Sequence, residues 1–430
     1  MKKILGFALL AGLATVFVAA QTTDDDFFGP QPVKAPWILD WGASVSPSAV
    51  AELDGADDLV LATVGSSLWL RMSLPASGQL YARLKDTLVF TLYPQPAAGE
   101  GLTHLWDLDA AYYRLSLKDA GLTVHLGRKS FALGSGLVLA GTGDGLDLQW
   151  VSPGLTVSAL GLYSGLLRPD YSSWTKSAWD VDNGPRRAMA GGSAATTFGN
   201  HGLTLLGLYQ YDLGTDSAAL YQSWYAGAQA RGVLLTGEYQ LEAWYQGGTS
   251  PLGSGTATIS AFAGRAGYTM FFRAPMSPSA SVQYAVASGD ADRTTVADAA
   301  GNATGQDNGF QGFGSISAGG VLRPDFGNIQ IFQAGITLNP LESGPAWLKK
   351  TNAGLKYFYY MKYDINGVIN DGEADLPSLD VGHGVDASLR WGPLSDLNVT
   401  VSGGMFIPGA AYAASEPLQY SASVGLSVSF

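Results

Sequence analysis

The strongest constraint on the fold is a strict alternation of residue types at the end of the chain. In "LQYSASVGLSVSF", residues 418–430, every second residue from Leu418 to Phe430 is apolar, and the residues between them are Gln, Ser or Gly. Side chains of a β-strand point alternately to the two faces of its sheet, so this pattern predicts a strand with one apolar and one polar face. The chain ends on the apolar face, which must be covered by something.

The same period of two recurs along the chain and predicts an all-β fold. It is clear in residues 67–74, 80–85, 235–246, 279–286, 355–362 and 385–391. In residues 106–117 the pattern places Trp106, Leu108, Ala110 and Tyr112 on the apolar face, and the parity then slips, as it does at a β-bulge. Turn sequences such as "PASG", "KDAG" and "WGPLSD" separate the segments.

Short turns alternate loosely with long polar connections, notably residues 168–185 and 290–309. This asymmetry is typical of transmembrane β-barrels. We predict a single antiparallel transmembrane β-barrel of about 16–18 strands, and the count is open around residues 134–143, 186–198 and 310–323. A soluble β-sandwich or solenoid would also alternate, but the chain shows neither interdomain linkers nor a fixed repeat.

Composition agrees with a sheet that faces lipid. Only 14% of residues are charged, and there are 56 glycines, 20 tyrosines and 11 tryptophans in 430 residues, whereas an average soluble domain has about 25% charged residues. Lipid would cover the apolar face of residues 418–430, and pairing of this strand with the first strand, near residues 37–46, would close the barrel. The terminal Phe430 also resembles the signal that bacterial barrel-assembly machinery reads.

The first twenty residues read as an export signal. Lys2 and Lys3 precede an apolar run that is too short to span a bilayer as a helix, and small residues precede Gln21. We therefore divide the chain into a signal peptide (1–20), a short N-terminal segment (21–36) and the barrel (37–430). The predicted location is the outer membrane of a Gram-negative-type bacterium.

Composition also excludes several classes of site. There is no cysteine, so disulfides and thiolate metal sites are absent, and no cofactor or metal is predicted. Without Lys2 and Lys3, 22 basic residues face 36 acidic ones, a formal charge near −14. Nucleic acid, which requires a basic surface, is not an expected partner.

In a barrel, parity assigns side chains to the lumen or to lipid, and lumen residues set selectivity. In the first half of the barrel the predicted pore-lining cations are Arg71, Arg83, Lys85, Arg114 and Arg128 or its neighbour Lys129, with Asp107 and Asp109 among them. Such a basic sector could form a constriction with a transverse field, or its charges could simply pair with one another and solvate the lumen. Weaker candidates, with a structural role as the alternative, are Glu238, Glu242, Lys356, Lys362, Asp386 and Arg390.

Other motifs do not indicate chemistry. The glycine-rich residues 134–145 have no following helix and no Lys-Ser or Lys-Thr pair, so they read as a tight β connection. Residues 290–309 carry four aspartates. We expect a solvated, mobile external loop, and the alternative is calcium binding or lipopolysaccharide bridging. The four histidines lie in no nucleophile-elbow pattern, so an enzyme is not expected.

Three segments resemble the alginate-export type of outer-membrane porin. Residues 122–148 resemble that family's strand with a Gly-Arg pair and a glycine-rich turn, and residues 282–295 resemble its strand ending in Ser-Gly-Asp before a long acidic loop. Residues 383–409 resemble its penultimate hairpin, with an inward acid and a Phe-x-Pro-Gly end. The resemblance implies a monomeric barrel of about 18 strands that passes a polyuronate or another small solute through a strongly basic lumen. This chain departs from that pattern, because it is acidic overall and its inward positions carry both signs.

The expected function is therefore that of a porin for passive diffusion of small hydrophilic solutes, with saccharides or uronates as the candidate class. The expected partners are outer-membrane lipid, the barrel-assembly machinery and the solute. The alternative is a closed barrel that acts through its long loops as an adhesin or a structural surface protein. The sequence does not identify the solute or the oligomeric state.

Overall fold

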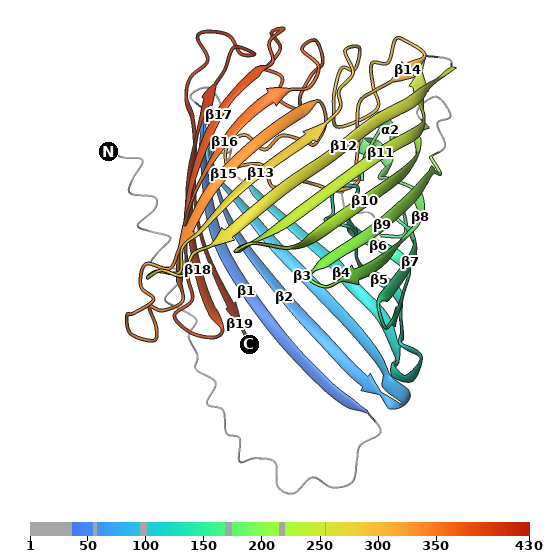
Figure 1. Ribbon diagram of the computed structural model, residues 1–430, viewed down its shortest axis with the longest axis vertical. Helices are drawn as coiled ribbons and strands as arrows, with labels where there is room; N and C mark the ends of the chain where they lie inside the picture. The colour runs from blue at the N-terminus through green and yellow to red at the C-terminus, as the bar shows by residue number, and fades with distance from the viewer. Residues whose placement is uncertain (1–36, 55–57, 95–100, 168–173, 215–219, 254) are drawn as a thin grey trace, which may run out of the picture.

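Eighteen antiparallel strands form one closed ring in the described part of the chain (Figure 1). The computed structural model describes residues 37–54, 58–94, 101–167, 174–214, 220–253 and 255–430. A further strand of two residues, β14, pairs in parallel with β12 and is not part of the ring. The predicted all-β barrel is confirmed, at the upper end of the predicted strand number. The predicted signal peptide lies outside the described residues.

The strands are connected in sequence order around the ring. Their bounds are β1 Ile38–Leu53, β2 Leu59–Leu74, β3 Gly78–Tyr93, β4 Leu102–Leu117, β5 Leu122–Leu133, β6 Leu139–Ser152, β7 Leu155–Tyr163, β8 Arg187–Phe198, β9 His201–Asp212, β10 Gln222–Leu234, β11 Gly237–Leu252, β12 Gly255–Phe271, β13 Ser279–Ala287, β14 Gln306–Asp307, β15 Ile329–Leu338, β16 Thr351–Lys362, β17 Asp380–Trp391, β18 Leu397–Pro408 and β19 Gln419–Ser429. A short helix, α2 (Ala178–Asn183), lies between β7 and β8.

The ring closes where the sequence predicted. Strand β19 pairs antiparallel with β1, with Ser44 opposite Ser429 and Leu53 opposite Tyr420. Past the end of β19, the backbone N–H of Phe430 donates to the carbonyl of Ala43 at 2.8 Å, and the N–H of Ala43 donates back at 3.2 Å. These bonds satisfy backbone groups that would otherwise form a free sheet edge.

The outer face of the ring is apolar. Trp41, Leu126, Leu205 and Val401 are large side chains on this face, with exposed fractions between 45% and 61%. Such exposure is unfavourable in water but suits a surface covered by lipid, and it explains the alternation in the sequence. Among the described residues, no helix is both long enough and apolar enough to cross a membrane.

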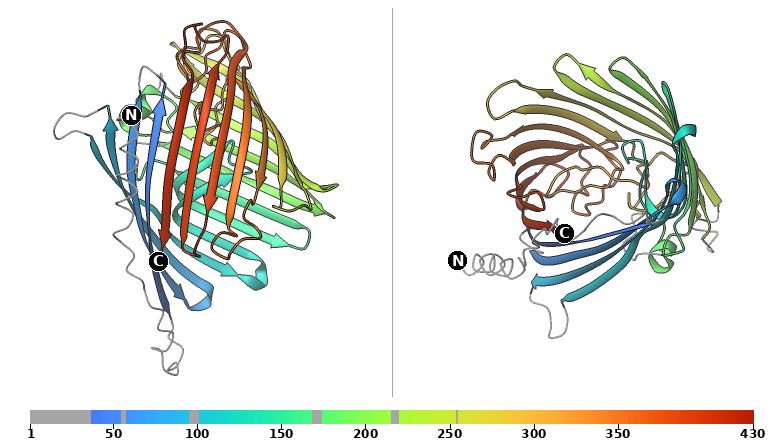
Figure 2. Two further views of the ribbon diagram at one scale, coloured as in Figure 1. Left: turned by 90° about the vertical axis from the view of Figure 1, so that its left-hand side faces the viewer. Right: turned by 90° about the horizontal axis from the view of Figure 1, so that it is seen from below.

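The two ends of the barrel differ. At one end, the turn end, most connections are short, for example residues 75–77, 118–121 and 199–200. At the other, the loop end, β7–β8, β13–β15 and β16–β17 are joined by residues 164–186, 288–328 and 363–379. The view along the barrel shows the β13–β15 connection inside the ring of strands (Figure 2). We call residues 288–328 the inner loop.

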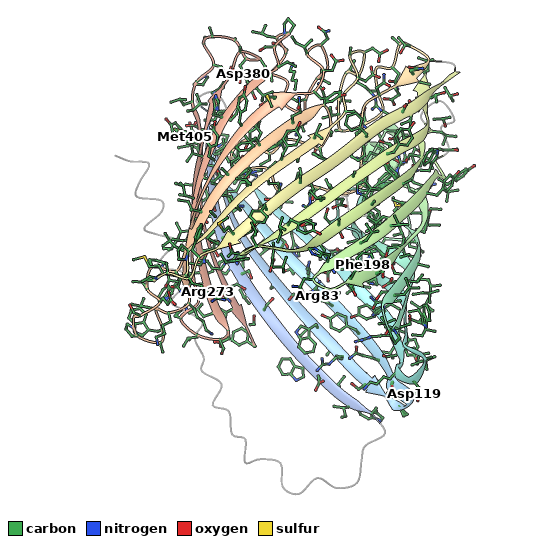
Figure 3. All side chains as sticks on the ribbon, in the orientation of Figure 1. Arg83, Asp119, Phe198, Arg273, Asp380 and Met405 are labelled. Atoms are coloured by element: carbon green, nitrogen blue, oxygen red, sulfur yellow. The ribbon has the colours of Figure 1, made fainter. Side chains whose placement is uncertain are left out.

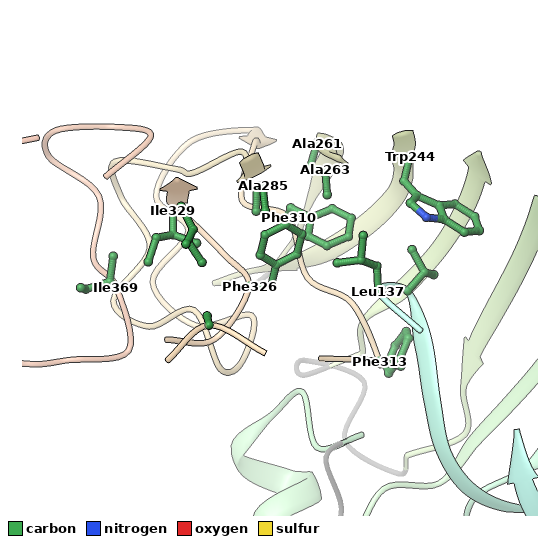
Figure 4. Packing of buried hydrophobic residues seen from close by; sticks show 14 of the residues in the cluster. Leu137, Trp244, Ala261, Ala263, Ala285, Phe310, Phe313, Phe326, Ile329 and Ile369 are labelled. Carbon is green, nitrogen blue, oxygen red and sulfur yellow. The ribbon is translucent and has the colours of Figure 1, made fainter. Parts of the chain in front are cut away.

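The inner loop and its neighbours form a hydrophobic core inside the barrel. Phe310 and Phe313 from the inner loop, Leu137 from the β5–β6 connection and Ile369 from the β16–β17 connection pack with Trp244 and Ile329 of the wall (Figure 4). The prediction of a solvated loop at residues 290–309 is confirmed only in part: Thr294, Ala303 and Gln306 are exposed, whereas Arg293, Ala299 and Asp307 are buried. Arg293 and Asp307 form a buried ion pair at 2.5 Å within it. The predicted strand number was open in three segments. Residues 134–138 connect β5 to β6, which begins at Leu139; residues 187–198 form β8; and residues 310–323 form no strand.

Candidate functional site

The inner face of β2–β5 presents cations and aromatic rings in neighbouring positions. The register places Trp69 of β2 opposite Arg83 of β3, and Arg71 of β2 opposite Tyr81 of β3. Farther along the wall, Arg114 of β4 is opposite His125 of β5. Directly opposite residues in a sheet lie on the same face, so each of these rings has a cation beside it. Arg83 is marked on this wall in Figure 3.

The rings form a continuous row across four strands. Ring centroids are 6.3 Å apart between Trp69 and Tyr81, 5.2 Å between Tyr81 and Tyr112, and 5.6 Å between Tyr112 and His125. We call Trp69, Tyr81, Tyr112 and His125 the aromatic row. None of the four was among the predicted site residues, although the alternation already placed Trp69 and Tyr81 on the same face as Arg71 and Arg83.

Carboxylates hold the cations of this wall in place. Asp109 accepts two hydrogen bonds from Arg83, at 2.8 and 2.5 Å, and its Oδ2 lies 2.6 Å from Nζ of Lys85. Asp147 lies 2.5 Å from Nζ of Lys129 and 3.3 Å from His125. Asp40 pairs with Arg71 at 2.6 Å. Three carboxylates thus balance most of the charge, and Arg114 has no ion-pair partner among the described residues.

A β-bulge brings Asp109 into this arrangement. Arg83 pairs with Ala110, but the next residue of β3, Leu84, pairs with Leu108, which leaves Asp109 as the extra residue. The predicted parity slip therefore exists but was misplaced: it occurs at Asp109, not after Tyr112. As a consequence Tyr112, predicted on the apolar face, lies on the inner face instead, where its ring contacts that of Tyr81. Sequence alternation cannot locate a bulge when several residues around it tolerate either face.

These side chains border a cavity of about 430 Å³. Its lining is Tyr81, Arg83, Lys85, Asp109, Ala110, Tyr112, His125, Lys129, Ser130 and Thr142. Lys129 rather than Arg128 borders the cavity. Arg128 is buried, pairs with Asp144 at 2.6 Å and donates to the carbonyl of Leu167 at 2.9 Å. Asp107 is opposite Lys85 in the register, outside the set of residues that line the cavity.

The weaker candidates fall into two groups. Lys356 and Asp386 are opposite each other on β16 and β17, and Arg390 lies on the same face of β17. Glu238 lies near the turn end of β11 and is exposed. These four residues remain candidates for the lumen lining.

The prediction that Glu242 and Lys362 line a water-filled lumen was wrong. Glu242 is 3% exposed, accepts from Nε1 of Trp244 at 2.8 Å and is covered by the β5–β6 connection, where the N–H of Ser135 donates to it. Lys362 is 2% exposed and donates to the carbonyl of Leu376 at 3.2 Å. Alternation assigned the correct face, but it gives no information about loops that fold into the barrel.

A hydroxyl-bearing wall adjoins the aromatic row. Ser44 and Ser67 are hydrogen-bonded at 2.8 Å between β1 and β2, Ser46 donates to Ser427 of β19 at 3.2 Å, and Ser402 and Ser423 are bonded at 2.6 Å between β18 and β19. These serines occupy the polar face predicted for the terminal strand. In the described residues, no three His, Asp or Glu side chains come together as metal ligands would.

A closed antiparallel barrel with an apolar outer face and a charged, aromatic inner wall defines an outer-membrane channel of the porin class. The family described as Alginate export matches residues 182–425. This match covers more than half of the chain, and the chain belongs to that family. Its location is the bacterial outer membrane.

Solved outer-membrane proteins of Pseudomonas aeruginosa share the fold. OccK8 (OprE) is 13% identical, with 91% of this chain and 98% of that chain covered and a TM-score of 0.55. OprD is 14% identical, with 91% and 94% covered and a TM-score of 0.57. OpdK with vanillate is 11% identical, with 91% and 98% covered and a TM-score of 0.57. No curated protein matches the sequence.

Proposed function

We propose that this channel passes small acidic, hydroxyl-rich solutes, with uronates and saccharides that contain them as the class. The observation that carries the proposal is the alternation of rings and cations along the cavity wall. A pyranose ring has an apolar face that packs on aromatic side chains, and its carboxylate can pair with a neighbouring guanidinium or ammonium group. Serine hydroxyls on the adjacent wall can exchange hydrogen bonds with sugar hydroxyls.

The distribution of charge supports a solute that carries both a charge and a neutral polar surface. Asp109, Asp147 and Asp40 neutralise most of the cations, so the wall is not strongly basic in sum. A channel for simple inorganic anions would gain nothing from the aromatic row. The membership of the alginate export family favours a channel over a closed barrel that acts as an adhesin.

The first test is single-channel recording of the refolded mature protein in a planar bilayer under a salt gradient. Glucuronate, glucose and acetate are then added separately, and block of the current is measured. We expect a steady conductance with stronger block by glucuronate than by either glucose or acetate. Equal block by the three solutes, or no conductance from folded protein, would contradict the proposal.

The matching variants follow from the register. Replacing Arg71, Arg83 and Arg114 together by serine is expected to shift the reversal potential toward cations and to weaken block by glucuronate, with folding retained. Arg273→Ser is the control, because Arg273 is an exposed residue of the β12–β13 connection and was not predicted to line the pore. An unchanged reversal potential in the triple variant would show that these arginines do not line the conducting path.

Cleavage after residue 20, recognition of Phe430 by the assembly machinery and a monomeric state remain predictions. N-terminal sequencing of the mature protein would test the first. Its expected first residue is Gln21.

A further inference from the structure

Strands β4 and β5 are paired along only part of their length. Their register runs from Leu117 opposite Leu122 to Ala111 opposite Arg128 and stops there. The other side of each strand stays paired toward the loop end, β4 with β3 as far as Leu102 and β5 with β6 as far as Leu133. Residues 102–110 and 129–133 therefore border a gap in the wall, which we call the β4–β5 split. The left view of Figure 2 shows the end of the β3–β4 hairpin standing apart from the neighbouring wall.

The β4–β5 split differs from the β12–β13 pair, in which the two strands are also hydrogen-bonded along only part of their length. Strand β12 pairs with β13 only from Ala263 onward, but the inner loop covers the rest of its edge. There the N–H of Thr258 donates to Gly305, and the N–H of Ser288 donates to Phe262, both at 2.9 Å. In the part of the chain that the structure describes, no backbone group outside β3 pairs with residues 102–110. Among the described residues, the β4–β5 split is thus a wall opening whose edge along residues 102–110 is unpaired.

The surroundings of the split are aqueous. Unpaired backbone N–H and C=O groups are strongly unfavourable in hydrocarbon, so an open strand edge is not tolerated there. The outer face beside the split mixes charged and apolar side chains: Asp86 and His104 form an exposed ion pair there, and Trp106 beside them is also exposed, whereas Arg128, which pairs with Asp144, is buried. Nearer the turn end, Leu126 and Leu146 occupy the same outer face and are exposed. The exposed ion pair, the exposed Trp106 and the unpaired backbone together place the split at the membrane–water interface or beyond it.

The cavity of the candidate site lies at the apex of the split. Its lining includes Lys85, Asp109 and Ala110 from one side of the gap and Lys129 and Ser130 from the other. The last paired residues, Ala111 and Arg128, are next to it in sequence on both strands. Lys85 and Lys129 thus border a cavity that lies next to the gap in the barrel wall.

The inner loop obstructs the direct route along the barrel axis. It contacts the β5–β6 connection at Phe313, whose N–H donates to the carbonyl of Val138 at 2.7 Å. It also contacts the wall at Arg323, which pairs with Glu52 of β1 at 2.5 Å. Tyr360 of β16 donates to the carbonyl of Ala318 at 2.6 Å. The loop thus reaches from the β5–β6 hairpin to β16 and β1, across the loop end.

We propose that the β4–β5 split is a lateral entrance through which ions and small anionic solutes pass between the external water and the cationic cavity. The solute class rests on the proposed function, whereas the entrance itself rests on the pairing, the cavity and the inner loop. Lys85 and Lys129, one on each side of the gap, would be the first cations that an entering anion meets.

The native chain contains no cysteine, so the test can use thiol cross-linking. Leu108→Cys and Ala132→Cys place one thiol on each side of the split, and a short bis-thiol-reactive reagent then bridges it. The control pair is Tyr113→Cys with Leu126→Cys, which are opposite each other on the same two strands where these are already paired. Single-channel conductance in potassium chloride is measured before and after bridging, and glucuronate block is measured in the same recordings.

We expect bridging of the split to lower the conductance severalfold and bridging of the control pair to leave it unchanged. Unchanged conductance after complete bridging of the split would overturn the proposal. If the two introduced thiols formed a disulfide rapidly and completely without the reagent, the proposal would also be overturned, because β4 and β5 would then be paired at the split. The potassium chloride conductance does not depend on the solute class. If glucuronate fails to block the current, only the proposed function is contradicted. The conductance before and after bridging still decides whether the split is an entrance.

Discussion

The carboxylate of Asp109 binds the guanidinium of Arg83 through both of its oxygens, at 2.8 and 2.5 Å, and one of these oxygens also contacts Lys85. A single buried acid therefore orients two cations at the edge of the cavity. It can do so because a β-bulge inserts Asp109 between two regularly paired residues. The local charge and the geometry of this wall thus depend on one extra residue in β4.

Asp109→Asn is expected to increase selectivity for anions. The substitution removes one negative charge next to the cavity and leaves Arg83 and Lys85 in place. A change of about 1 kT in the electrostatic energy of a monovalent ion raises the anion concentration and lowers the cation concentration about threefold each, so the permeability ratio changes roughly sevenfold. The reversal potential in a salt gradient measures it. Asp107→Asn is the matched control, since Asp107 lies on the same strand without an ion pair in the described residues, and an equal shift in both variants would argue against a special role for Asp109.

Tyr112→Ala is expected to weaken block by glucuronate without moving the reversal potential. Tyr112 lies between Tyr81 and His125 in the aromatic row, tilted against the first ring and edge-on to the second, and it carries no charge. Loss of one stacking contact is worth about 1 kcal/mol, or roughly a fivefold weaker affinity. Concentration-dependent current block gives the affinity. Tyr112→Phe should retain it; if it binds as weakly as Tyr112→Ala, the hydroxyl rather than the ring face is responsible.

Lys176→Met is expected to stabilise the β7–β8 connection at neutral pH. Burial lowers the pKa of Lys176 from 10.5 to about 8, with Asp325 and Asp180 opposing the shift and Arg187 and Arg293 adding to it. Below pH 8 the buried charge costs about 3 kcal/mol. Between pH 8 and 10.5 the unfolded chain binds more protons than the folded one, so stability rises with pH in this window.

The pH window gives the measurement. Proteolysis of the β7–β8 connection should slow from pH 8 to 10 in the native protein, relative to the methionine variant, which should lack this pH dependence. Lys349→Met is the control, because Lys349 is exposed. Identical pH profiles for the native protein and Lys176→Met would show that the lysine stays charged and solvated.

Phe430→Ala distinguishes the role of Phe430 in closing the barrel from a role as a signal for insertion into the outer membrane. The substitution keeps both backbone hydrogen bonds to Ala43 and removes only the aromatic side chain. If the assembly machinery recognises this ring, the substitution should reduce insertion into the outer membrane in cells. Refolding in detergent, measured by heat-modifiable gel migration, should stay normal. Deletion of Phe430 removes both bonds, at about 1 kcal/mol each, and should lower the temperature of unfolding as well. Equal insertion of Phe430→Ala and the native protein would contradict a signal role.

The alternation of apolar and polar residues correctly predicted which face of the sheet a side chain occupies wherever the strand is regular. The barrel, the closure of β19 on β1 and the shared inner face of Arg71, Arg83 and Lys85 all follow from a period of two. The position of the bulge at Asp109 does not, because the pairing partner rather than the local sequence decides which residue is extra.

The long connections were predicted less well. Arg293 and Asp307 lie in a segment with the composition of a solvated loop, yet they form a buried ion pair inside the barrel. Glu242 and Lys362 are covered by loops from distant parts of the sequence. Contacts of this kind have no periodic signal, so single-sequence reasoning could assign the face of these residues but not their burial.

The reach of the inner loop has a consequence for the order of folding events. Arg323 and Glu52 are 271 positions apart in sequence, and their contact brings the inner loop against β1, which adjoins the later strands only once β19 has closed the ring. Contacts between such distant residues carry a large loop-closure entropy until the intervening strands are paired. We therefore expect the newly inserted protein to pass through a ring-closed stage with an unfilled interior, which conducts more ions than the mature channel until the inner loop docks.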